Sequence, residues 1–356
     1  MRAYAIAFAA AAATSVPLVV LVRNFAQRRG LVDPAGGRKG HKVEVPRLGG
    51  LGIFLGFVVG VTAGWMLRAP ELGWSIAATR IVLGAALLFA SGLADDLLHR
   101  RGREGLPALV KLAVQIGAAA LVASVARIHG FRLPGHEWYA LPVAVQWTVT
   151  LIWIVGVTNA INFIDGMDGL AGGLSLIIAA TLAVVAYSRA KPFNTQGEAI
   201  LALALAGGIV GFLRCNFPPA SIFMGDGGAL LLGFVLSSIA ISGVMKSATV
   251  LAIGAPLIIL ALPMVDLTKV VVGRVLRGQH PMQADRTHLH HRLQDAGWSV
   301  YSALLFAYAI CGLCCSAALS LLRIHGGAAI LSLAVALLLV AVAAKRPHGL
   351  AADEDE

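Results

Sequence analysis

The chain has 356 residues, of which 58% are hydrophobic and only 13% are charged, and its mean hydropathy is +0.82. Soluble domains carry about 25% charged residues, so this composition excludes an ordinary soluble protein and indicates an integral membrane protein. The net charge of +10 comes from basic residues scattered over short segments. That pattern argues against nucleic acid as a partner and fits attraction to the anionic headgroups of a lipid bilayer.

Apolar runs long enough to cross the hydrocarbon core of a bilayer recur along the whole chain. They cover residues 4–22, 48–67, 78–94, 107–125, 141–160, 170–187, 199–213, 228–244, 249–272, 301–321 and 328–344. We therefore expect an all-α integral membrane fold with about eleven transmembrane helices. The first run resembles a signal peptide, but the basic sequence RNFAQRRG follows it directly and favours a retained helix. No linker or repeat divides the chain, so we expect one polytopic domain over residues 1–356, with a short tail over 345–356.

Lysine and arginine are unevenly divided between the two ends of these helices. One side holds 18 of the 28 basic residues and the opposite side holds nine. The richer side consists of residues 23–47, 95–106, 160–169, 214–227, 269–300 and the tail from 345. Because cytoplasmic loops carry the excess of basic residues, we expect a periplasmic N-terminus and a cytoplasmic C-terminus. All eleven aspartates fall on the expected cytoplasmic side, which predicts an active site on that face.

The densest polar motif is VTNAINFIDGMDGLAGGLSLI, at residues 157–177, where Asn159, Asn162, Asp165 and Asp168 recur at three-residue intervals. Three residues are about 60° short of a helical turn, so one straight helix cannot aim all four side chains at a common point. We expect a membrane helix that delivers the asparagines, a turn that presents the aspartates, and a new helix from Leu170. Because unpaired amides are costly inside an apolar segment, a binding site explains the motif better than a simple helix cap.

Four further segments on the same side combine acidic, basic and imidazole groups. They are GHKVEVPRLGG at 40–50, SGLADDLLHRRG at 91–102, SIFMGDGGALLLGF at 221–234 and DRTHLHHRLQDAG at 285–297. Carboxylates are hard oxygen ligands suited to Mg²⁺, and the glycines beside Asp226 let backbone approach a phosphate closely. The HxHH sequence lacks a fourth ligand at zinc spacing, so zinc is disfavoured. This inventory suits phosphoryl transfer, in which positioning and charge neutralisation provide most of the catalysis.

In order, the motifs HKVEVPRLGG, ADD, NAINFIDGMDGLAGG, MGDGGALLLG, PMVDLTKVVVGR and THLHHRL resemble those of the polyprenyl-phosphate N-acetylhexosamine-1-phosphate transferases, glycosyltransferase family 4. The resemblance is to the branch that uses UDP-N-acetylglucosamine. It implies transfer of a sugar 1-phosphate from a UDP-N-acetylhexosamine to undecaprenyl phosphate, with release of UMP. It also implies dependence on Mg²⁺, with Mn²⁺ as a substitute, and a multi-pass location in the bacterial inner membrane. A homodimer is left open.

The resemblance implies roles for individual residues. Asp226 matches a metal-binding aspartate, with Asp95 or Asp165 left open as a second ligand. Asp95 and Asp96 match an aspartate pair that acts at the lipid phosphate, and Asp165 is counted with them as catalytic. The substrate-binding positions are Lys42, Asn159, Asn162, Asp168, His288, His290, His291 and Arg292. His99 stands where relatives often carry Lys or Asp, so a third charge at that position is left open.

Two alternatives remain. Phospho-N-acetylmuramoyl-pentapeptide transferases of peptidoglycan synthesis tend to show an uninterrupted triple histidine followed by an acidic residue, and a PTMGG segment. This chain has a leucine between His288 and His290, Arg292 after the histidines, and PRLGG at 46–50. These differences favour a small sugar, N-acetylglucosamine first, for an O-antigen of lipopolysaccharide, a teichoic acid or a related glycan. A transporter for an anionic solute would carry polar groups near mid-membrane, whereas these gather at one surface.

Overall fold

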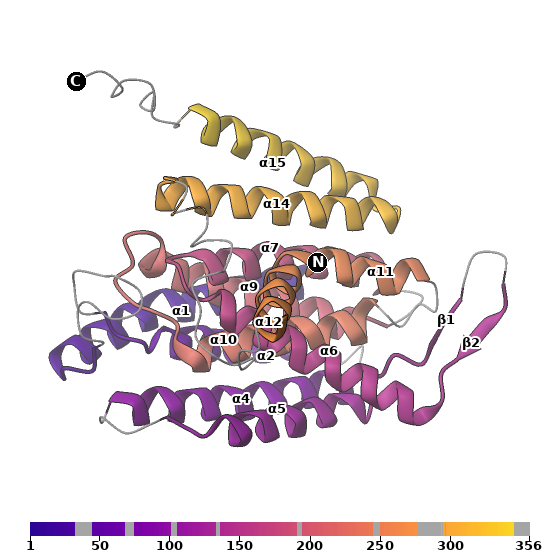
Figure 1. Ribbon diagram of the computed structural model, residues 1–356, viewed down its shortest axis with the longest axis horizontal. Coiled ribbons are helices and arrows are strands. Elements are labelled where there is room, and N and C mark those ends of the chain that lie inside the picture. The colour runs from indigo at the N-terminus through magenta and orange to yellow at the C-terminus, as the bar shows by residue number, and fades with distance from the viewer. Residues whose placement is uncertain are drawn as a thin grey trace.

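The computed structural model describes residues 1–32, 45–67, 75–100, 105–132, 136–190, 194–244, 250–276, 293, 295 and 297–344. Within these ranges the chain is a stack of long helices with one small β-hairpin at one end (Figure 1). The helices are α1 (Arg2–Arg28), α2 (Gly49–Met66), α4 (Ile76–Arg100), α5 (Ala108–Ala123), α6 (Val143–Ile164), α7 (Leu170–Ser188), α9 (Gln196–Asn216), α10 (Gly225–Ile239), α11 (Val250–Ile259), α12 (Ala261–Leu276), α14 (Val300–Leu321) and α15 (His325–Ala344). A π-helical turn, η1 (Ala240–Val244), extends α10.

Within the described residues each predicted apolar run contains at least one helix, and the protein is an all-α integral membrane protein that crosses the membrane several times. Eight of the described helices are long and apolar enough to span a bilayer: α1, α2, α4, α6, α7, α9, α10 with its extension, and α14. The described part of α15 and the whole of α5 are shorter apolar helices. The total of eleven crossings and the orientation of the chain stay predictions.

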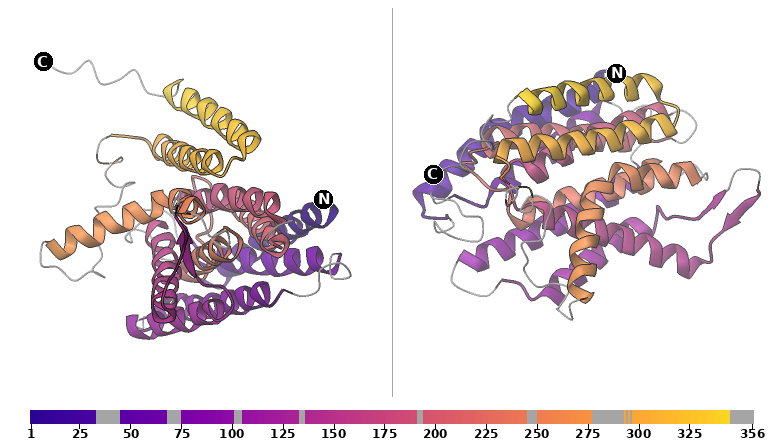
Figure 2. Two further views of the ribbon diagram at one scale, coloured as in Figure 1. Left: turned by 90° about the vertical axis from the view of Figure 1, so that its right-hand side faces the viewer. Right: turned by 45° about the horizontal axis from the view of Figure 1, so that its top comes forward.

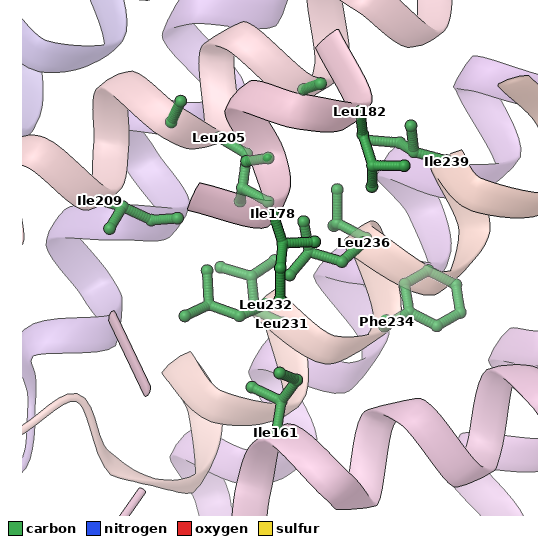
Figure 3. Close-up of a cluster of buried hydrophobic side chains, with 14 of the residues drawn as sticks. Ile161, Ile178, Leu182, Leu205, Ile209, Leu231, Leu232, Phe234, Leu236 and Ile239 are labelled. Carbon is green, nitrogen blue, oxygen red and sulfur yellow. The ribbon is translucent and has the colours of Figure 1, made fainter. Parts of the chain in front are cut away.

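The centre of the bundle is α10, which is apolar on all sides. Its span is 94% buried, against 28% to 78% for the other candidate spans. A helix that is hydrophobic all round belongs in the interior, and α10 packs against α2, α4, α6, α7 and α9. Figure 3 shows Leu231, Phe234 and Ile239 of this helix among buried side chains that include Ile161 and Ile178.

Glycines let neighbouring helices approach the first turn of α10. A Cβ added to Gly92 of α4 would overlap the backbone of Gly227, and one added to Gly50 of α2 would overlap the backbone of Gly228. Small residues at membrane helix interfaces permit this close approach of backbones. The C-terminal part of α4 and the N-terminal end of α2 therefore meet at the start of α10, where the candidate site lies.

A second group of helices, formed by α1, α2 and α9, packs in the same way. The Ser15 hydroxyl donates a buried hydrogen bond of 2.7 Å from α1 to the Gly208 carbonyl of α9. This interface lies along the middle of the two helices and stabilises the bundle away from their polar ends.

The prediction of a single helix over 249–272 is wrong. Two helices, α11 and α12, lie in this run and are separated by a break at Leu260. In Figure 1 α12 is seen end-on, and in the left view of Figure 2 it extends away from the stack. Pro263 lies in the first turn of α12, where its missing N–H is not needed, and it cannot continue the hydrogen-bond ladder of α11. Hydropathy alone does not report this change of direction.

The second difference is a β-hairpin between α5 and α6. Strands β1 (Gly130–Arg132) and β2 (Trp138–Ala140) pair antiparallel, with Phe131 opposite Tyr139. The hairpin follows the C-terminal end of α5 and precedes α6, so it lies at the opposite end of the bundle from the turn between α6 and α7 (Figure 1). Three-residue strands are too short to be predicted from alternation of apolar residues.

Candidate active site

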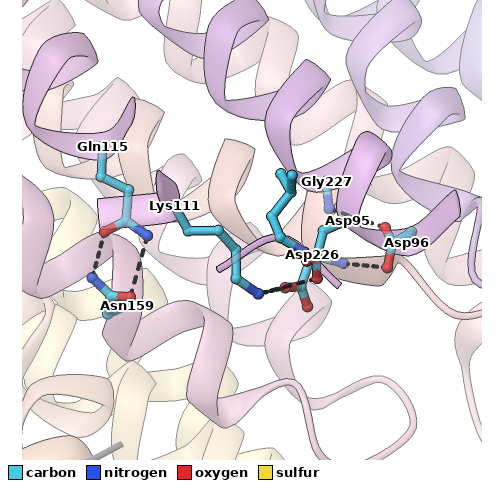
Figure 4. A network of polar contacts seen from close by, with 8 residues as sticks. Asp95, Asp96, Lys111, Gln115, Asn159, Asp226 and Gly227 are labelled. Atoms are coloured by element: carbon cyan, nitrogen blue, oxygen red, sulfur yellow. Dashed lines mark hydrogen bonds and ion pairs between the residues drawn. The ribbon is translucent and has the colours of Figure 1, made fainter. Parts of the chain in front are cut away.

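Three charged side chains from three helices meet at the start of α10. Lys111 Nζ of α5 lies 3.0 Å from Asp95 Oδ2 of α4 and 3.2 Å from Asp226 Oδ2 of α10 (Figure 4). The other oxygen of Asp95 accepts a hydrogen bond of 2.6 Å from the backbone N–H of Leu106. The Asp95 side chain is 10% exposed and that of Asp226 is 33% exposed, so the cluster opens on the Asp226 side.

Asp96 follows Asp95 directly but makes different contacts. Its two carboxylate oxygens accept hydrogen bonds from the backbone N–H groups of Asp226, at 3.1 Å, and Gly227, at 3.2 Å. These donors belong to the first turn of α10, where the first N–H groups of a helix lack partners and the helix dipole is positive. Asp96 is buried and also interacts electrostatically with Arg47. It therefore acts as a cap for a helix other than its own.

The backbone before α10 requires glycine for this arrangement. Gly225 has φ +72°, in the left-handed region that favours glycine. A Cβ there would overlap both the Asp96 carboxylate and the Arg47 carbonyl oxygen. The sequence MGDGG thus places Asp226 at the first turn of α10 because only glycine fits beside Asp96.

The PRLGG segment lies against the same loop. The Phe223 N–H donates to the Pro46 carbonyl at 2.8 Å, and the Gly49 N–H donates back to the Phe223 carbonyl at 2.8 Å. A further bond of 2.9 Å joins the Gly50 N–H to the Met224 carbonyl. Two motifs that lie far apart in the sequence are therefore side by side, and Arg47 is brought to the start of α10.

The NxxNxxDGxDG motif folds as a helix, a turn and a helix, as predicted. Helix α6 ends at Ile164, the Asp165 N–H donates to the Asn162 carbonyl at 3.3 Å, and α7 begins at Leu170. Gly169 closes the turn with φ +75°. Asp165 is half-buried at the end of α6, so the carboxylates of this motif lie outside the apolar part of the helix, as the spacing required.

Asp168 and Gly169 hold the turn against the segment between α9 and α10. Asp168 Oδ2 accepts a hydrogen bond of 2.9 Å from the Ala220 N–H, and the Gly169 N–H donates to Asn216 Oδ1 at 3.0 Å. Asn216 Nδ2 in turn donates to the Ile222 carbonyl at 2.8 Å. Asp168 is buried, so the contact to Ala220 fixes the second aspartate of the motif in a position different from that of Asp165.

Asn159 does not point toward the turn. Its side-chain amide pairs with that of Gln115 on α5: Asn159 Nδ2 donates to Gln115 Oε1 at 2.7 Å, and Gln115 Nε2 donates to Asn159 Oδ1 at 3.3 Å. Asn159 Nδ2 also donates to the Val155 carbonyl at 2.8 Å. The pair satisfies polar groups that would be costly if unpaired in a membrane helix.

Several predicted site residues lie outside the described part of the chain: Lys42, His288, His290, His291 and Arg292. The side chain of His99 is also outside it. Within the residues that the structure describes, no group of three or more His, Cys, Asp and Glu side chains is arranged to hold a metal ion. Asp95, Asp96 and Asp226 are brought together, whereas Asp165 and Asp168 belong to the neighbouring turn.

Sequence reasoning assigned no role to Lys111 and Gln115. The signal was present, because a lysine inside an apolar segment is expensive and marks function by default. Gln115 follows it by four residues and so lies on the same face of α5. Their partners on α4, α6 and α10 could not be read from the chain, because those pairings are long-range.

Comparison with known proteins supports the resemblance seen in the motifs. Residues 78–244 match glycosyl transferase family 4. A protein of Bacillus subtilis (strain 168) named "Probable undecaprenyl-phosphate N-acetylglucosaminyl 1-phosphate transferase" is 37% identical over 312 residues, which cover 86% of this chain and 81% of that protein. A decaprenyl-phosphate N-acetylglucosaminephosphotransferase of Mycobacterium tuberculosis (strain CDC 1551 / Oshkosh) is 34% identical over 309 residues, 81% of this chain and 74% of that protein.

A relative from the other branch is also similar. A phospho-N-acetylmuramoyl-pentapeptide-transferase of Lactiplantibacillus plantarum is 31% identical over 290 residues, 78% of this chain and 85% of that protein. The stretch that matches the family, residues 78–244, contains Asp95, Lys111 and Asp226 of the charged cluster. The chain belongs to glycosyl transferase family 4 and is a phosphosugar transferase.

Proposed function

We propose that the protein transfers N-acetylglucosamine 1-phosphate from UDP-N-acetylglucosamine to undecaprenyl phosphate, releasing UMP. The product is the lipid-linked diphosphate sugar that starts a cell-envelope glycan. The observation that carries this proposal is the cluster in which Lys111 contacts both Asp95 and Asp226. The names of the Bacillus and Mycobacterium relatives support the choice of sugar and of a polyprenyl phosphate acceptor.

The reaction joins two anions. An oxygen of the acceptor phosphate forms a bond to the β-phosphorus of the donor, and the bond from that phosphorus to the bridging oxygen breaks. The bridging oxygen leaves on UMP. A direct displacement and a two-step route through an aspartyl phosphate on Asp95 give the same products and the same net change in bonds. In either case the electrostatic repulsion between the phosphates must be offset by positive charge.

Lys111 supplies one such charge from inside the site. Its ammonium group holds Asp95 and Asp226 in a fixed relation, while the Leu106 N–H fixes the other oxygen of Asp95. A cation that is held before the substrates arrive requires little reorganisation during the reaction, which is the usual source of electrostatic catalysis. Lys111 therefore orients the carboxylates and lowers the repulsion between them and the incoming phosphates.

The carboxylates also fit a divalent cation. Asp95 and Asp226 share the single ammonium group of Lys111, which leaves one carboxylate charge for a cation, whereas Asp96 is buried and its oxygens already accept backbone N–H groups. The oxygens of Asp226, with those of Asp95 as a second set, are hard ligands of the kind that Mg²⁺ prefers. When bound, Mg²⁺ supplies positive charge to the oxygens of the diphosphate.

The site is proposed to face the cytoplasm. Asp95, Lys111 and Asp226 lie at the C-terminal end of α4 and the N-terminal ends of α5 and α10, which belong to one side of the bundle. The same side contains most of the lysine and arginine residues, as cytoplasmic segments do. With this orientation the donor site faces the compartment where nucleotide sugars are made, and we propose the bacterial inner membrane as the location of the protein.

The alternative donor is UDP-N-acetylmuramoyl-pentapeptide, in line with the name of the Lactiplantibacillus relative. One assay distinguishes the two. Purified protein is incubated with undecaprenyl phosphate, Mg²⁺ and each UDP-sugar in turn, and UMP is measured. We expect UMP from UDP-N-acetylglucosamine and none from the pentapeptide donor. UMP from the pentapeptide donor alone would reverse the assignment, and no UMP from any donor would overturn the proposed function.

A further inference from the structure

A reciprocal amide pair between Gln115 and Asn159 links α5 to α6 (Figure 4). Gln115 is buried, with 5% of its surface exposed, and Asn159 is half-buried. Both amides use a donor and an acceptor in the pair, so each fixes the orientation of the other. In a hydrocarbon environment no water replaces a lost partner, which makes such a pair a rigid contact between two helices.

The N-terminal half of α5 is packed only in part, with Val114 against the hydrophobic core. None of residues 108–114 is buried, and Leu109 is 79% exposed. Gln115 is the first buried residue of the helix, and Ala118 and Ala119 continue its face. These alanines are small and offer less contact area than longer apolar side chains. Gln115 and the charged contacts of Lys111 therefore add to the contacts with α4 in fixing the lateral position of the first turns of α5.

On α5 the amide pair is one helical turn from the charged cluster. Lys111 precedes Gln115 by four residues on the same face of α5. Asn159 precedes Asn162 by three residues and Asp165 by six on the segment that leads into the turn. The pair thus joins the helix that carries the ammonium group to the helix that ends at the DGMDG turn.

We propose that Gln115 and Asn159 are positioning residues, which set the register of α5 against α6 and thereby hold Lys111 between Asp95 and Asp226. The proposal rests on the proposed function and assigns Asn159 to the partner Gln115 instead of to the donor. It explains why an asparagine stands one turn inside the membrane segment, away from the other polar groups of its motif.

The test uses three variants of the full chain: Gln115→Ala, Asn159→Ala, and the exchange Gln115→Asn with Asn159→Gln. We expect each alanine variant to lower kcat about 10- to 100-fold, the effect of a small misplacement of a reacting group. The KM for UDP-N-acetylglucosamine should change little, because neither side chain contacts the donor. The exchange keeps both amides and their combined length, so it should recover most of the lost kcat.

A matched control separates positioning from a loss of stability. Ser15→Ala removes a buried hydrogen bond between α1 and α9, away from the site. It should lower the midpoint of thermal unfolding, as the alanine variants do, yet leave kcat unchanged at temperatures well below that midpoint. Equal losses of kcat in Ser15→Ala and Gln115→Ala would overturn the positioning role.

Two further outcomes are decisive. A raised donor KM in Asn159→Ala alone, with no recovery in the exchange variant, would place Asn159 at the donor and overturn the proposal. If the unaltered protein releases UMP and both alanine variants have the same kcat as it does, the positioning role is overturned and the proposed function stands. Absence of UMP release from the wild-type protein would instead remove the proposed function on which this inference rests.

Discussion

Asp96 holds Asp226 in place through the backbone, because its carboxylate accepts hydrogen bonds from the N–H groups of Asp226 and of the next residue, Gly227. Adjacent aspartates in one motif therefore make different contacts: Asp95 binds Lys111, and Asp96 caps α10. An active site gains precision when its groups are supported by a second set of fixed contacts. Here the support comes from a buried carboxylate that meets a helix N-terminus.

Asp96→Asn should destabilise the protein and weaken metal binding. An amide has one acceptor oxygen for two backbone donors, and its NH₂ group would face an N–H of α10. Leaving a buried donor unsatisfied costs about 1–3 kcal/mol. We expect a lower midpoint of thermal unfolding and a higher Mg²⁺ concentration for half-maximal UMP release. An unchanged midpoint with turnover lost at every Mg²⁺ concentration would instead indicate that Asp96 reacts directly with substrate.

Asp226→Asn should abolish turnover in a protein that still folds and inserts into the membrane. The side chain is 33% exposed and its carboxylate contacts Lys111, so little packing is lost. The change replaces an anionic oxygen by an amide and weakens binding of Mg²⁺. UMP release measures turnover, and the midpoint of thermal unfolding serves as the control. Near-normal turnover of this variant at low Mg²⁺ concentration would remove Asp226 from the metal role.

Lys111→Met should lower kcat by about 10² or more, as expected when a preorganised charge is removed. Methionine replaces the apolar stem of the side chain and omits only the terminal ammonium group, so the packing of α5 is retained. Asp95 and Asp226 then lose the cation that they share. Lys111→Arg is the matched control, because it keeps the charge with a different geometry, and it should retain part of the activity. Turnover of the methionine variant equal to that of the wild type would exclude Lys111 from the site.

The helices and the helix–turn–helix at 157–177 could be predicted because their causes are local. Apolar length predicts a membrane helix, and the Asp-Gly pairs predict a turn between Ile164 and Leu170. The break between α11 and α12 also has a local cause in Pro263, but the apolar run continues through it and concealed it. A hydropathy pattern therefore finds the helices and misses their directions.

The partners within the site could not be predicted because they depend on which helices are neighbours. Lys111 reaches Asp226 across 115 positions of sequence, and Asp96 reaches the N–H of the same residue across 130. A single sequence indicates that these polar residues are functional. It does not show that Asp96 accepts hydrogen bonds from backbone N–H groups while Asp95 contacts the ammonium group of Lys111. Those facts follow from the glycine contacts that bring α4 and α10 together.

The orientation of the chain can be tested with reporters. The uneven division of lysine and arginine predicts that the N-terminus faces the periplasm and that Glu356 faces the cytoplasm. A reporter that is active only in the periplasm should be inactive when fused after Glu356 and active when fused in the β1–β2 hairpin, at the opposite end from the site. The reverse pattern of activity would contradict both the orientation and the cytoplasmic position of the site.

The approach of α4 to α10 can be tested with a pair of glycine substitutions. Gly92→Ala adds a methyl group that would overlap the backbone of Gly227, directly beside the N–H that Asp96 caps. Because backbone cannot yield as a flexible side chain does, the helices must separate, and both the cap and the contact between Asp95 and Lys111 should be disturbed. Gly117→Ala on α5 meets nothing within 4 Å and is the matched control.

We expect Gly92→Ala to lower the midpoint of thermal unfolding and to reduce UMP release about 10-fold or more, since a displaced site loses catalysis steeply with distance. Gly117→Ala should leave both quantities near their wild-type values, because alanine favours a helix over glycine and no neighbour has to move. If the two variants behave alike, the close contact between α4 and α10 does not position the site. If Gly92→Ala loses stability but keeps its kcat, the contact between α4 and α10 stabilises the bundle, and the hydrogen bonds from Asp96 are sufficient to hold Asp226 in place.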